Sequence, residues 1–258
     1  SSAASDVYKR QFSYTNDKEA KQTFKHTFKN ERVTAKISLQ KQDKETKKAV
    51  PQGDATLEKA VYGLYAREDI VHPDGATGVV YKAGEQVATL TTDKNGQASV
   101  DGLYLGNYYV KEITPPTGYL ADEEEHDLVC NYEGDLVAEV KRECLSLEQV
   151  MKQPFQIIKA ANNGKTDADL LKGAGFTAYL VSSLKVNEDG SYDFDSAKPV
   201  VIGENGATEI FTDEKGYACS IAIPYGTYIV RETTTPHNYT PVDDFIVQIT
   251  ENLSLIHI

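Results

Sequence analysis

The chain has 258 residues and a formal net charge of −12 at pH 7, from 27 Lys and Arg against 39 Asp and Glu. Nucleic-acid binding depends on clustered Lys and Arg, so this balance argues against a nucleic-acid partner. No run approaches the roughly 18 apolar residues of a membrane helix and no signal peptide opens the chain, so we expect no membrane contact for this piece.

The first 31 residues continue neither half of the chain. Residues 1–11 and 253–258 resemble translated sequencing-adapter sequence, so we expect both to be non-native. Within residues 12–31, alternate positions follow a strand pattern: Phe24, His26, Phe28 and Asn30. We expect an orphan last strand of a truncated preceding unit, joined to residue 32 without a Gly or Pro spacer. Orphan strands expose edges, so the chain is expected to aggregate or swap strands in solution.

Short segments rich in β-branched and aromatic residues, bounded by Gly, Asn, Asp and Pro, predict strands throughout the rest of the chain. The strands expected in the first half are Val33–Leu39, Val61–Arg67, Gln86–Thr91, Tyr108–Ile113 and Val137–Arg142. Those expected in the second half are Phe155–Lys159, Gly175–Val181, Val200–Ile202, Thr227–Thr233 and Phe245–Thr250. Such a pattern predicts an all-β chain of antiparallel, Ig-like two-sheet sandwiches.

One sequence pattern occurs twice, 120 residues apart. Residues 92–119 and 212–239 both read T-D-x-x-G, nine other positions, then G-x-Y-x-V-x-E-x-x-x-P-x-x-Y. A fixed spacing of this kind indicates a duplicated structural unit. We therefore expect two repeats, at 32–152 and 153–252, the second lacking its last strand.

Strand periodicity places one lysine and one glutamate in the buried phase of each repeat. Lys41 follows Ala35, Ile37 and Leu39 in phase, and Lys159 follows Phe155 and Ile157. Glu112 and Glu232 alternate with the Tyr and Val of the repeated pattern. Because burying a lone charge costs several kcal/mol, each lysine is expected to meet its glutamate. Two plainer readings stay open: an ordinary buried ion pair, or a strand end already in solvent.

Four motifs in this order, occurring twice, resemble the Cna protein B-type domains, also called SpaA-like or prealbumin-like pilin domains. The motifs are the strand with Lys41 or Lys159, the segments Leu57-x-x-Ala60-x-Tyr62 and Leu171-x-Gly173-Ala174-x-Phe176, the T-D-x-x-G turn and the closing pattern. The resemblance implies extracellular, cell-wall-attached repeats of Gram-positive adhesins and pilins, and it covers nearly the whole chain.

Many members of that family carry an intramolecular isopeptide bond from a first-strand lysine to an Asn or Asp in the last strand, promoted by a glutamate. By this resemblance, Lys41 and Lys159 would be the nucleophiles, and Glu112 and Glu232 would have the catalytic, isopeptide-promoting role. A buried lysine has its pKa lowered and can act as a neutral nucleophile, while a carboxyl with a raised pKa relays protons. The result is a single self-modification, not enzymatic turnover.

The acceptor position is where this chain departs from the family pattern. Asn30, eleven residues before Lys41, resembles the acceptor of the preceding unit, whereas Glu148 stands eleven residues before Lys159. We therefore predict no isopeptide bond in this chain, and a Lys41–Glu112 ion pair in its place in the first repeat.

Other candidate sites are weaker. Asp189, Asp193 and Asp195 lack the Gly and Glu spacing of a calcium loop, and the acidic run 122–127 is expected to be a charged loop. The five histidines show no metal spacing and no catalytic triad order, so we expect no metal, no cofactor and no enzyme.

Cys130, Cys144 and Cys219 are too few and too unevenly placed for a disulfide framework. Tyr104, Tyr109 and Tyr225 could face a ligand, although sheet packing is the simpler expectation.

The sequence therefore predicts a structural stalk or shaft whose partners are the neighbouring repeats of the same chain. The full-length molecule would carry any host or matrix protein contact. The alternative is a repeat that itself binds such a protein, which would show one exposed apolar or aromatic patch that its neighbour lacks.

Overall fold

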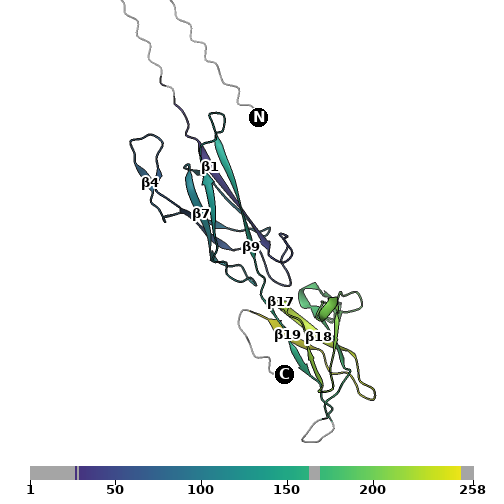
Figure 1. Ribbon diagram of the computed structural model, residues 1–258. Helices are drawn as coiled ribbons and strands as arrows, with labels where there is room; N and C mark the ends of the chain where they lie inside the picture. The colour runs from purple at the N-terminus through teal and green to yellow at the C-terminus, as the bar shows by residue number, and fades with distance from the viewer. Residues whose placement is uncertain (1–26, 28, 163–168, 251–258) are drawn as a thin grey trace, which may run out of the picture. The chain divides into compact units, whose positions relative to one another are not determined.

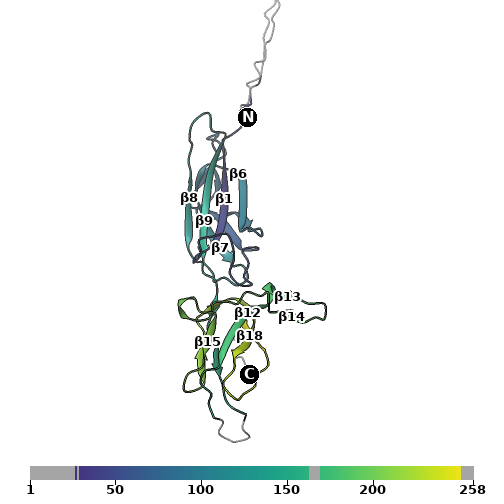
Figure 2. The ribbon, with the colours of Figure 1, turned by 90° about the vertical axis from the view of Figure 1, so that its right-hand side faces the viewer.

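Strands dominate the computed structural model, which describes residues 27, 29–162 and 169–250 (Figures 1 and 2). Every strand found among these described residues lies in the unit that begins at Arg32. The first repeat contains β1 (Thr34–Asp43), β2 (Val61–Ala66), β3 (Ile70–Val71), β4 (Val79–Tyr81), β5 (Gln86–Thr91), β6 (Gln97–Leu103), β7 (Gly106–Thr114), β8 (Glu125–Cys130) and β9 (Glu139–Glu148).

The second repeat is built from shorter strands and two 3-10 turns. It contains β10 (Lys152–Gln153), β11 (Gln156–Ile158), β12 (Gly175–Leu180), η1 (Val181–Ser183), β13 (Lys185–Val186), β14 (Tyr192–Asp193), η2 (Glu204–Gly206), β15 (Glu209–Phe211), β16 (Tyr217–Cys219), β17 (Ile223–Pro224), β18 (Gly226–Thr234) and β19 (Phe245–Ile249). Within the described residues, no helix has the length and apolar character needed to cross a membrane.

Each repeat has two main sheets. In the first repeat these are the three-stranded β6-β1-β9 and the four-stranded β5-β2-β7-β8, with β3 and β4 forming a separate hairpin. In the second repeat the four-stranded sheet has the order β15-β12-β18-β19, and β11 pairs with β16. The prediction of an all-β chain of tandem sandwiches is confirmed.

One strand pair departs from the expected antiparallel arrangement. The first and last strands of the first repeat, β1 and β9, run parallel over ten residue pairs, from Thr34 opposite Glu139 to Asp43 opposite Glu148. The other strand pairs that the structure describes are antiparallel. The first and last strands of this repeat therefore lie side by side, and the chain enters at one end of the sheet and leaves at the other.

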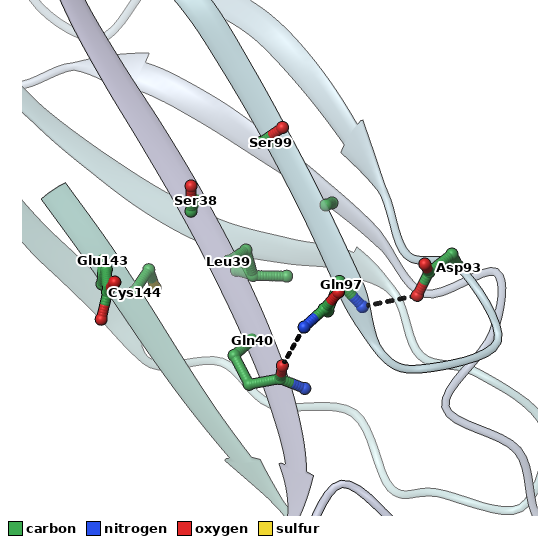
Figure 3. A pocket seen from close by; sticks show the side chains of 9 residues that line it. Ser38, Leu39, Gln40, Asp93, Gln97, Ser99, Glu143 and Cys144 are labelled. Carbon is green, nitrogen blue, oxygen red and sulfur yellow. Dashed lines mark hydrogen bonds between the residues drawn. The ribbon is translucent and has the colours of Figure 1, made fainter. Parts of the chain in front are cut away.

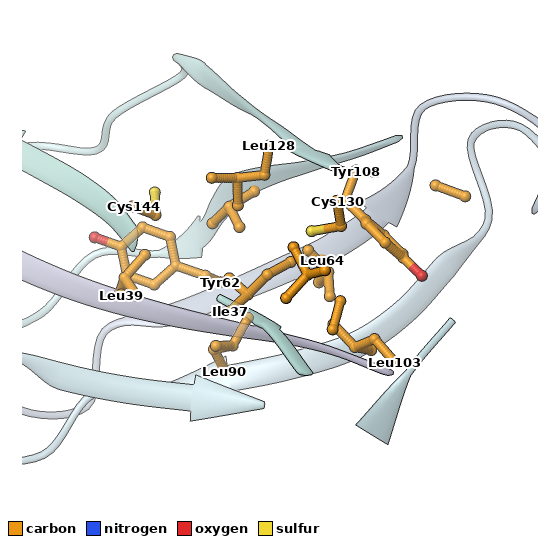
Figure 4. Close-up of a cluster of buried hydrophobic side chains, with 14 of the residues drawn as sticks. Ile37, Leu39, Tyr62, Leu64, Leu90, Leu103, Tyr108, Leu128, Cys130 and Cys144 are labelled. Carbon is orange, nitrogen blue, oxygen red and sulfur yellow. The ribbon is translucent and has the colours of Figure 1, made fainter. Parts of the chain in front are cut away.

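The core of the first repeat fills the space between its two sheets (Figure 4). Ile37 and Leu39 of β1 meet Tyr62 of β2 there, and each is at most 2% exposed. Burying a large apolar side chain contributes about 1.5–3 kcal/mol, so this cluster supplies much of the repeat's stability. Cys130 and Cys144 lie in the same core, and both are free thiols.

Some expected elements differ in the structure. The expected strand at Val200–Ile202 is wrong: this stretch has no regular structure, although Val200 N donates to Ala178 O at 2.8 Å. Strands β6 and β8 were not expected; in β6, polar outward residues such as Ser99 and Asp101 hide the strand pattern. The expected orphan strand at residues 24–30 falls mostly outside the described residues.

A smaller apolar cluster lies where the second repeat follows the first. It consists of Ala55, Leu57, Tyr119 and Val150, with Tyr225 of the second repeat packed against it. The Asp54 amide donates to Tyr225 O at 2.8 Å, and its carboxylate accepts from Thr227 N at 3.0 Å.

Candidate functional site

The T-D-x-x-G turn fixes the backbone of the buried lysine in each repeat. The carboxylate of Asp93 accepts two backbone amides of its own turn, at 2.8 and 2.9 Å, and Asp213 does the same at 2.8 and 3.0 Å. The glycine carbonyl of the turn then accepts the lysine amide, 2.8 Å from Lys41 N and 2.7 Å from Lys159 N. The duplicated turn therefore fixes the backbone position from which each lysine side chain extends into the core.

The glycine of this turn cannot carry a side chain. Gly96 and Gly216 have φ values of 72° and 64°, in the left-handed region. A Cβ on either would stand 2.9 Å from Lys41 O or 2.3 Å from Lys159 O. The turn and the lysine backbone are therefore packed directly against each other.

In the first repeat, the Lys41 ammonium lies among three polar side chains. Its Nζ is 3.3 Å from Glu112 Oε1 and 3.2 Å from the Tyr62 hydroxyl, and it contacts Glu148 Oε1 directly. The side chains of Lys41 and Glu148 are 0% exposed, and that of Glu112 is 2% exposed. The network thus joins β1, β2, β7 and the last strand β9.

Glu148 stands at the acceptor position of the family pattern, but it was not expected to be part of this site. Its Oε1 also accepts from the Tyr62 hydroxyl at 2.5 Å and from Ser146 Oγ at 3.1 Å. Its Oε2 is buried without a hydrogen-bond partner. The parallel register of β1 and β9 explains its place, because it carries Glu148 level with Asp43, one inward position beyond Lys41.

The two glutamates of the repeated pattern are held alike by a following loop. Glu112 Oε2 accepts Asp122 N at 2.9 Å, and Glu232 Oε2 accepts Val242 N at 2.8 Å. Lys159 Nζ donates to that same oxygen of Glu232 at 2.7 Å, while Glu232 Oε1 is buried without a partner. Both expected Lys–Glu neighbours therefore lie together.

Burial governs the ionisation of the first-repeat site. It lowers the pKa of Lys41 to about 8, against the opposing effect of the nearby Glu112 carboxylate. Burial also raises the pKa of the Tyr62 hydroxyl, which therefore stays protonated and able to donate. The site combines an amine that can become neutral near pH 8 with a carboxyl in contact with it.

A second buried carboxylate supports the same end of β1. Asp43 Oδ2 accepts from the Tyr119 hydroxyl at 3.0 Å, and Asp43 Oδ1 accepts the amides of Glu45 and Thr46 at 3.0 and 2.9 Å. The Tyr119 ring centre lies 5.6 Å from Lys41 Nζ, within range of a cation–π contact. This explains why the closing pattern ends in tyrosine in the first repeat. Sequence periodicity, which places Asp43 in phase with Lys41, could have found this residue.

The weaker acidic candidates form turns. Asp189 Oδ1 accepts Ser191 N at 2.9 Å, and Asp193 Oδ1 accepts Asp195 N at 3.0 Å. Both contacts are the Asx turns that Asp commonly makes in loops. Asn30, the proposed acceptor of a preceding unit, is exposed and lies in no strand.

The acidic run is only partly a loop, because β8 begins at Glu125. Asp122, Glu124 and His126 bring one ligand atom each within 4.8 Å of one another. The Asp122 carboxylate accepts the Glu124 amide at 3.0 Å, and Glu124 is exposed. We assign no metal to this cluster, since a turn explains the geometry.

The three tyrosines considered as ligand-facing residues have protein neighbours. Tyr109 stacks on Tyr65 with ring centres 5.1 Å apart, and Tyr225 packs against the cluster between the repeats. Tyr104 lies under the Arg32 guanidinium at 4.0 Å and lines an apolar depression of about 220 Å³.

A larger, polar depression of about 650 Å³ lies over the sheet β6-β1-β9 (Figure 3). Small side chains such as Ser38 and Ser99 form its floor, while Gln97 Nε2 donates to Gln40 Oε1 at 3.0 Å at its edge. It opens on the face of the sheet opposite to the Lys41 side chain, so it gives no access to that site.

Comparison with known proteins agrees with this geometry. Residues 35–143 and 154–257 match the family described as SpaA, prealbumin-like fold domain. The chain belongs to this family. Its two matches coincide with the two structural repeats, so the SpaA-like prediction is confirmed. No curated protein matches the chain.

Several solved structures resemble the chain. The Bacillus anthracis TIE protein is 23% identical with a TM-score of 0.52, over 85% of this chain and 32% of that one. A streptococcal ancillary pilin is 23% identical with a TM-score of 0.32, over 88% and 62%. The shaft pilin SpaA of Lactobacillus rhamnosus GG is 17% identical with a TM-score of 0.32, over 85% and 94%. At these identities the likeness shows the fold alone, and the chain spans about a third of the TIE protein.

Proposed function

We propose that this SpaA-family chain supplies structural repeats of a stalk or pilus-like shaft on the surface of a Gram-positive cell. The family membership supports this proposal, as do the names of the pilins that share the fold. The buried Lys–Glu sites have almost no exposed surface, which fits a structural contact between strands better than a site that binds substrates. We propose no enzymatic activity, and place the protein outside the cell, attached to the cell wall.

The observation that carries this proposal is the parallel pairing of β1 with β9. Chain enters the first repeat through β1 and leaves it after β9, so tension along the chain pulls these strands in opposite directions. Ten residue pairs in parallel register then bear the load together, in shear. The Lys41 network adds contacts between the same two strands, through Glu148.

Single-molecule stretching of the chain through its two ends tests this role. We expect the first repeat to unfold at a higher force than the second, in which β11 pairs with β16 alone among the described residues. A variant with Glu148→Ala should lower the force of the first event only. Equal forces for the two repeats in the unaltered chain would contradict the stalk proposal.

For the covalent state, we propose that Lys41, Glu112 and Glu148 form an ionic network without an isopeptide bond. Amide formation between Lys41 and Glu148 would release one water, and the direct contact of Nζ with the carboxyl makes this the reaction to test. Intact-mass measurement should give the unmodified mass. A mass deficit of one water, mapped to a peptide linking β1 and β9, would show that the bond forms.

The alternative function, a repeat that itself binds a host or matrix protein, is favoured by one observation. Tyr104, Leu105 and Tyr132 line an apolar depression at one end of the first repeat, with Val33, Val71 and Pro73. A Tyr104→Ser variant that loses binding to immobilised matrix proteins, while keeping its unfolding force, would support this alternative.

A further inference from the structure

The connection between the repeats, residues 149–153, is hydrogen-bonded to both of them. At its start, Gln149 O accepts the Leu120 amide of the first repeat at 2.9 Å. At its end, β10 pairs with β17 of the second repeat. Domains joined by a flexible linker move relative to each other by default. A connection that is itself part of a strand pairing does not behave as such a linker.

Met151 is the residue at which the chain passes from one repeat to the other. Its amide donates to Gly118 O of the first repeat at 2.8 Å. Its carbonyl accepts the Tyr225 amide of the second repeat, also at 2.8 Å. These two bonds fix the peptide groups on both sides of Met151, so a rotation of one repeat against the other about this residue would break at least one of them.

The first repeat also holds Tyr225 from its other edge. Tyr225 O accepts the Asp54 amide at 2.8 Å, so the backbone of Tyr225 lies between the connection and the loop that contains Asp54. The Asp54 carboxylate accepts Thr227 N at 3.0 Å and the hydroxyl of Ser182. Asp54 therefore binds the second repeat at three points, through its amide and through both carboxylate oxygens.

Two glycines of the first repeat allow this close approach. Gly53 and Gly118 have φ values of 60° and 83°, which favour glycine. A Cβ on Gly53 would stand 2.2 Å from Tyr225 O, and a Cβ on Gly118 would stand 2.8 Å from the Tyr225 ring. The backbone of the first repeat is therefore packed directly against Tyr225 of the second.

Both sides of this contact are anchored in the cores of their own repeats. In the second repeat, the hydroxyl of Tyr228, which is 1% exposed, donates to Pro224 O at 2.7 Å, next to Tyr225. In the first repeat, Tyr119 is 0% exposed and its hydroxyl donates to Asp43 on β1. A displacement at the contact would therefore disturb buried side chains on both sides.

We propose that the bonds of Met151, Asp54 and Tyr225 form a rigid joint, through which the two repeats move as one body, and that Asp54 is the residue that locks it. The Glu45–Lys152 ion pair lies beside the joint but is partly exposed, and such pairs contribute little to stability. The joint should therefore hold at high salt. Its rigidity is independent of the stalk proposal, because a flexible joint would leave the unfolding force of the first repeat unchanged.

Distances between spin labels, measured by pulsed electron paramagnetic resonance, test the joint. The labels are attached at Lys94→Cys and Lys215→Cys, on exposed turns of the two repeats, in a Cys219→Ser background, since the other two cysteines are buried. We expect one narrow distance distribution, unchanged at about 1 M salt. Asp54→Ala and Tyr225→Ala should each broaden it. A broad distribution before these changes, or a narrow one after both, would overturn the proposal.

Hydrogen exchange at the amides of Met151 and Tyr225 gives a second measurement. Both amides should be protected in the unaltered chain. Asp54→Ala should speed their exchange about tenfold or more, because the loss of its carboxylate bonds favours local opening of the joint. The amides inside β1 and β18 should keep their rates, which distinguishes a loosened joint from an unfolded repeat.

The matched control is Asp74→Ala. The Asp74 carboxylate also accepts backbone amides, those of Ala76 and Thr77, but only within its own loop. This variant should leave the exchange at Met151 and Tyr225 unchanged. Rapid exchange of these two amides in the unaltered chain, or equal rates with and without Asp54→Ala, would show that Asp54 does not lock a rigid joint.

Discussion

The two repeats share a buried lysine, a glutamate and a turn, yet the lysine is surrounded by different carboxyl groups in each repeat. In the first repeat Lys41 faces two carboxyls, Glu112 and Glu148, whereas Lys159 in the second faces Glu232 alone among the described residues. Two carboxyls around one ammonium leave an excess of negative charge unless further donors share it. In the first repeat the last strand, β9, therefore decides the charge balance around the lysine, because it supplies Glu148.

The first repeat has two hydroxyl donors to the additional carboxyl, and the second repeat lacks the counterpart of one of them. Tyr62 and Ser146 both donate to Glu148 Oε1 in the first repeat. At the position of Tyr62 the second repeat has Phe176, which lacks the hydroxyl and lies in its apolar core. The first repeat therefore has both the second carboxyl, Glu148, and a hydroxyl that donates to it, Tyr62. The second repeat has Phe176 in place of that hydroxyl, and no counterpart of Glu148 among its described residues.

Removing the lysine should give the largest difference in stability between the two repeats. Lys41→Met leaves Glu112 and Glu148 buried together without a cation, so we expect the first repeat to lose about 3–5 kcal/mol of unfolding free energy. Chemical denaturation followed by probes in each repeat measures it. Lys159→Met is the matched control and should cost less, because it leaves one carboxyl instead of two. Equal losses in the two repeats would contradict the charge argument.

The pH dependence of stability should also separate the repeats. The folded-state pKa of Lys41 is about 8, below the ordinary 10.5, so between these values the unfolded chain binds more protons. We therefore expect the stability of the first repeat to rise from pH 8 toward pH 10, by on the order of 2 kcal/mol. Above about pH 10 the trend should reverse, because burial raises the pKa of Tyr62 and Tyr119 and the unfolded tyrosines ionise first.

Thermal or urea unfolding at a series of pH values measures this rise. The Lys41→Met variant should lack it between pH 8 and pH 10 while keeping the reversal at higher pH. A first repeat whose stability falls steadily from pH 8 upward would show that Lys41 stays charged in the folded state.

Strand alternation was enough to place the Lys–Glu neighbours, because β1 and β7 are regular and one-face buried. Lys41 follows Leu39 in phase and Glu112 follows Val110. In both strands the alternation of buried and less buried residues continues without a break up to these two side chains. The duplicated spacing of 120 residues gave the division into repeats for the same reason. Local periodicity predicts which face a side chain occupies.

The involvement of Glu148 could not be obtained in that way. Whether it reaches Lys41 depends on β9 running parallel to β1, and strand periodicity carries no information about direction or partner. The expected strand also ended at Arg142, six residues short, because alternation weakens around Glu143. Long-range pairing and its register come from tertiary packing, which a single sequence does not specify locally.

The hydroxyl of Tyr62 offers a finer test. Tyr62→Phe copies the residue of the second repeat and removes a donor to Glu148, so we expect a loss of about 1–2 kcal/mol in the first repeat. The reverse change, Phe176→Tyr, should not stabilise the second repeat, where no carboxyl corresponding to Glu148 is described. Urea unfolding of both variants measures the difference. If Phe176→Tyr were stabilising by a similar amount, the hydroxyl would act through packing and not through Glu148.

The smallest effect should come from Ser146, the second donor to Glu148. Its Oγ lies 3.1 Å from Glu148 Oε1 and 3.0 Å from the Tyr62 hydroxyl. Ser146→Ala leaves Tyr62 and Lys41 in contact with the carboxyl, so we expect a loss of about 1 kcal/mol or less. The loss should shrink further in a Tyr62→Phe background only if the two hydroxyls act as one unit. A double-mutant cycle from urea unfolding measures this coupling, and strictly additive losses would show that each donor serves Glu148 independently.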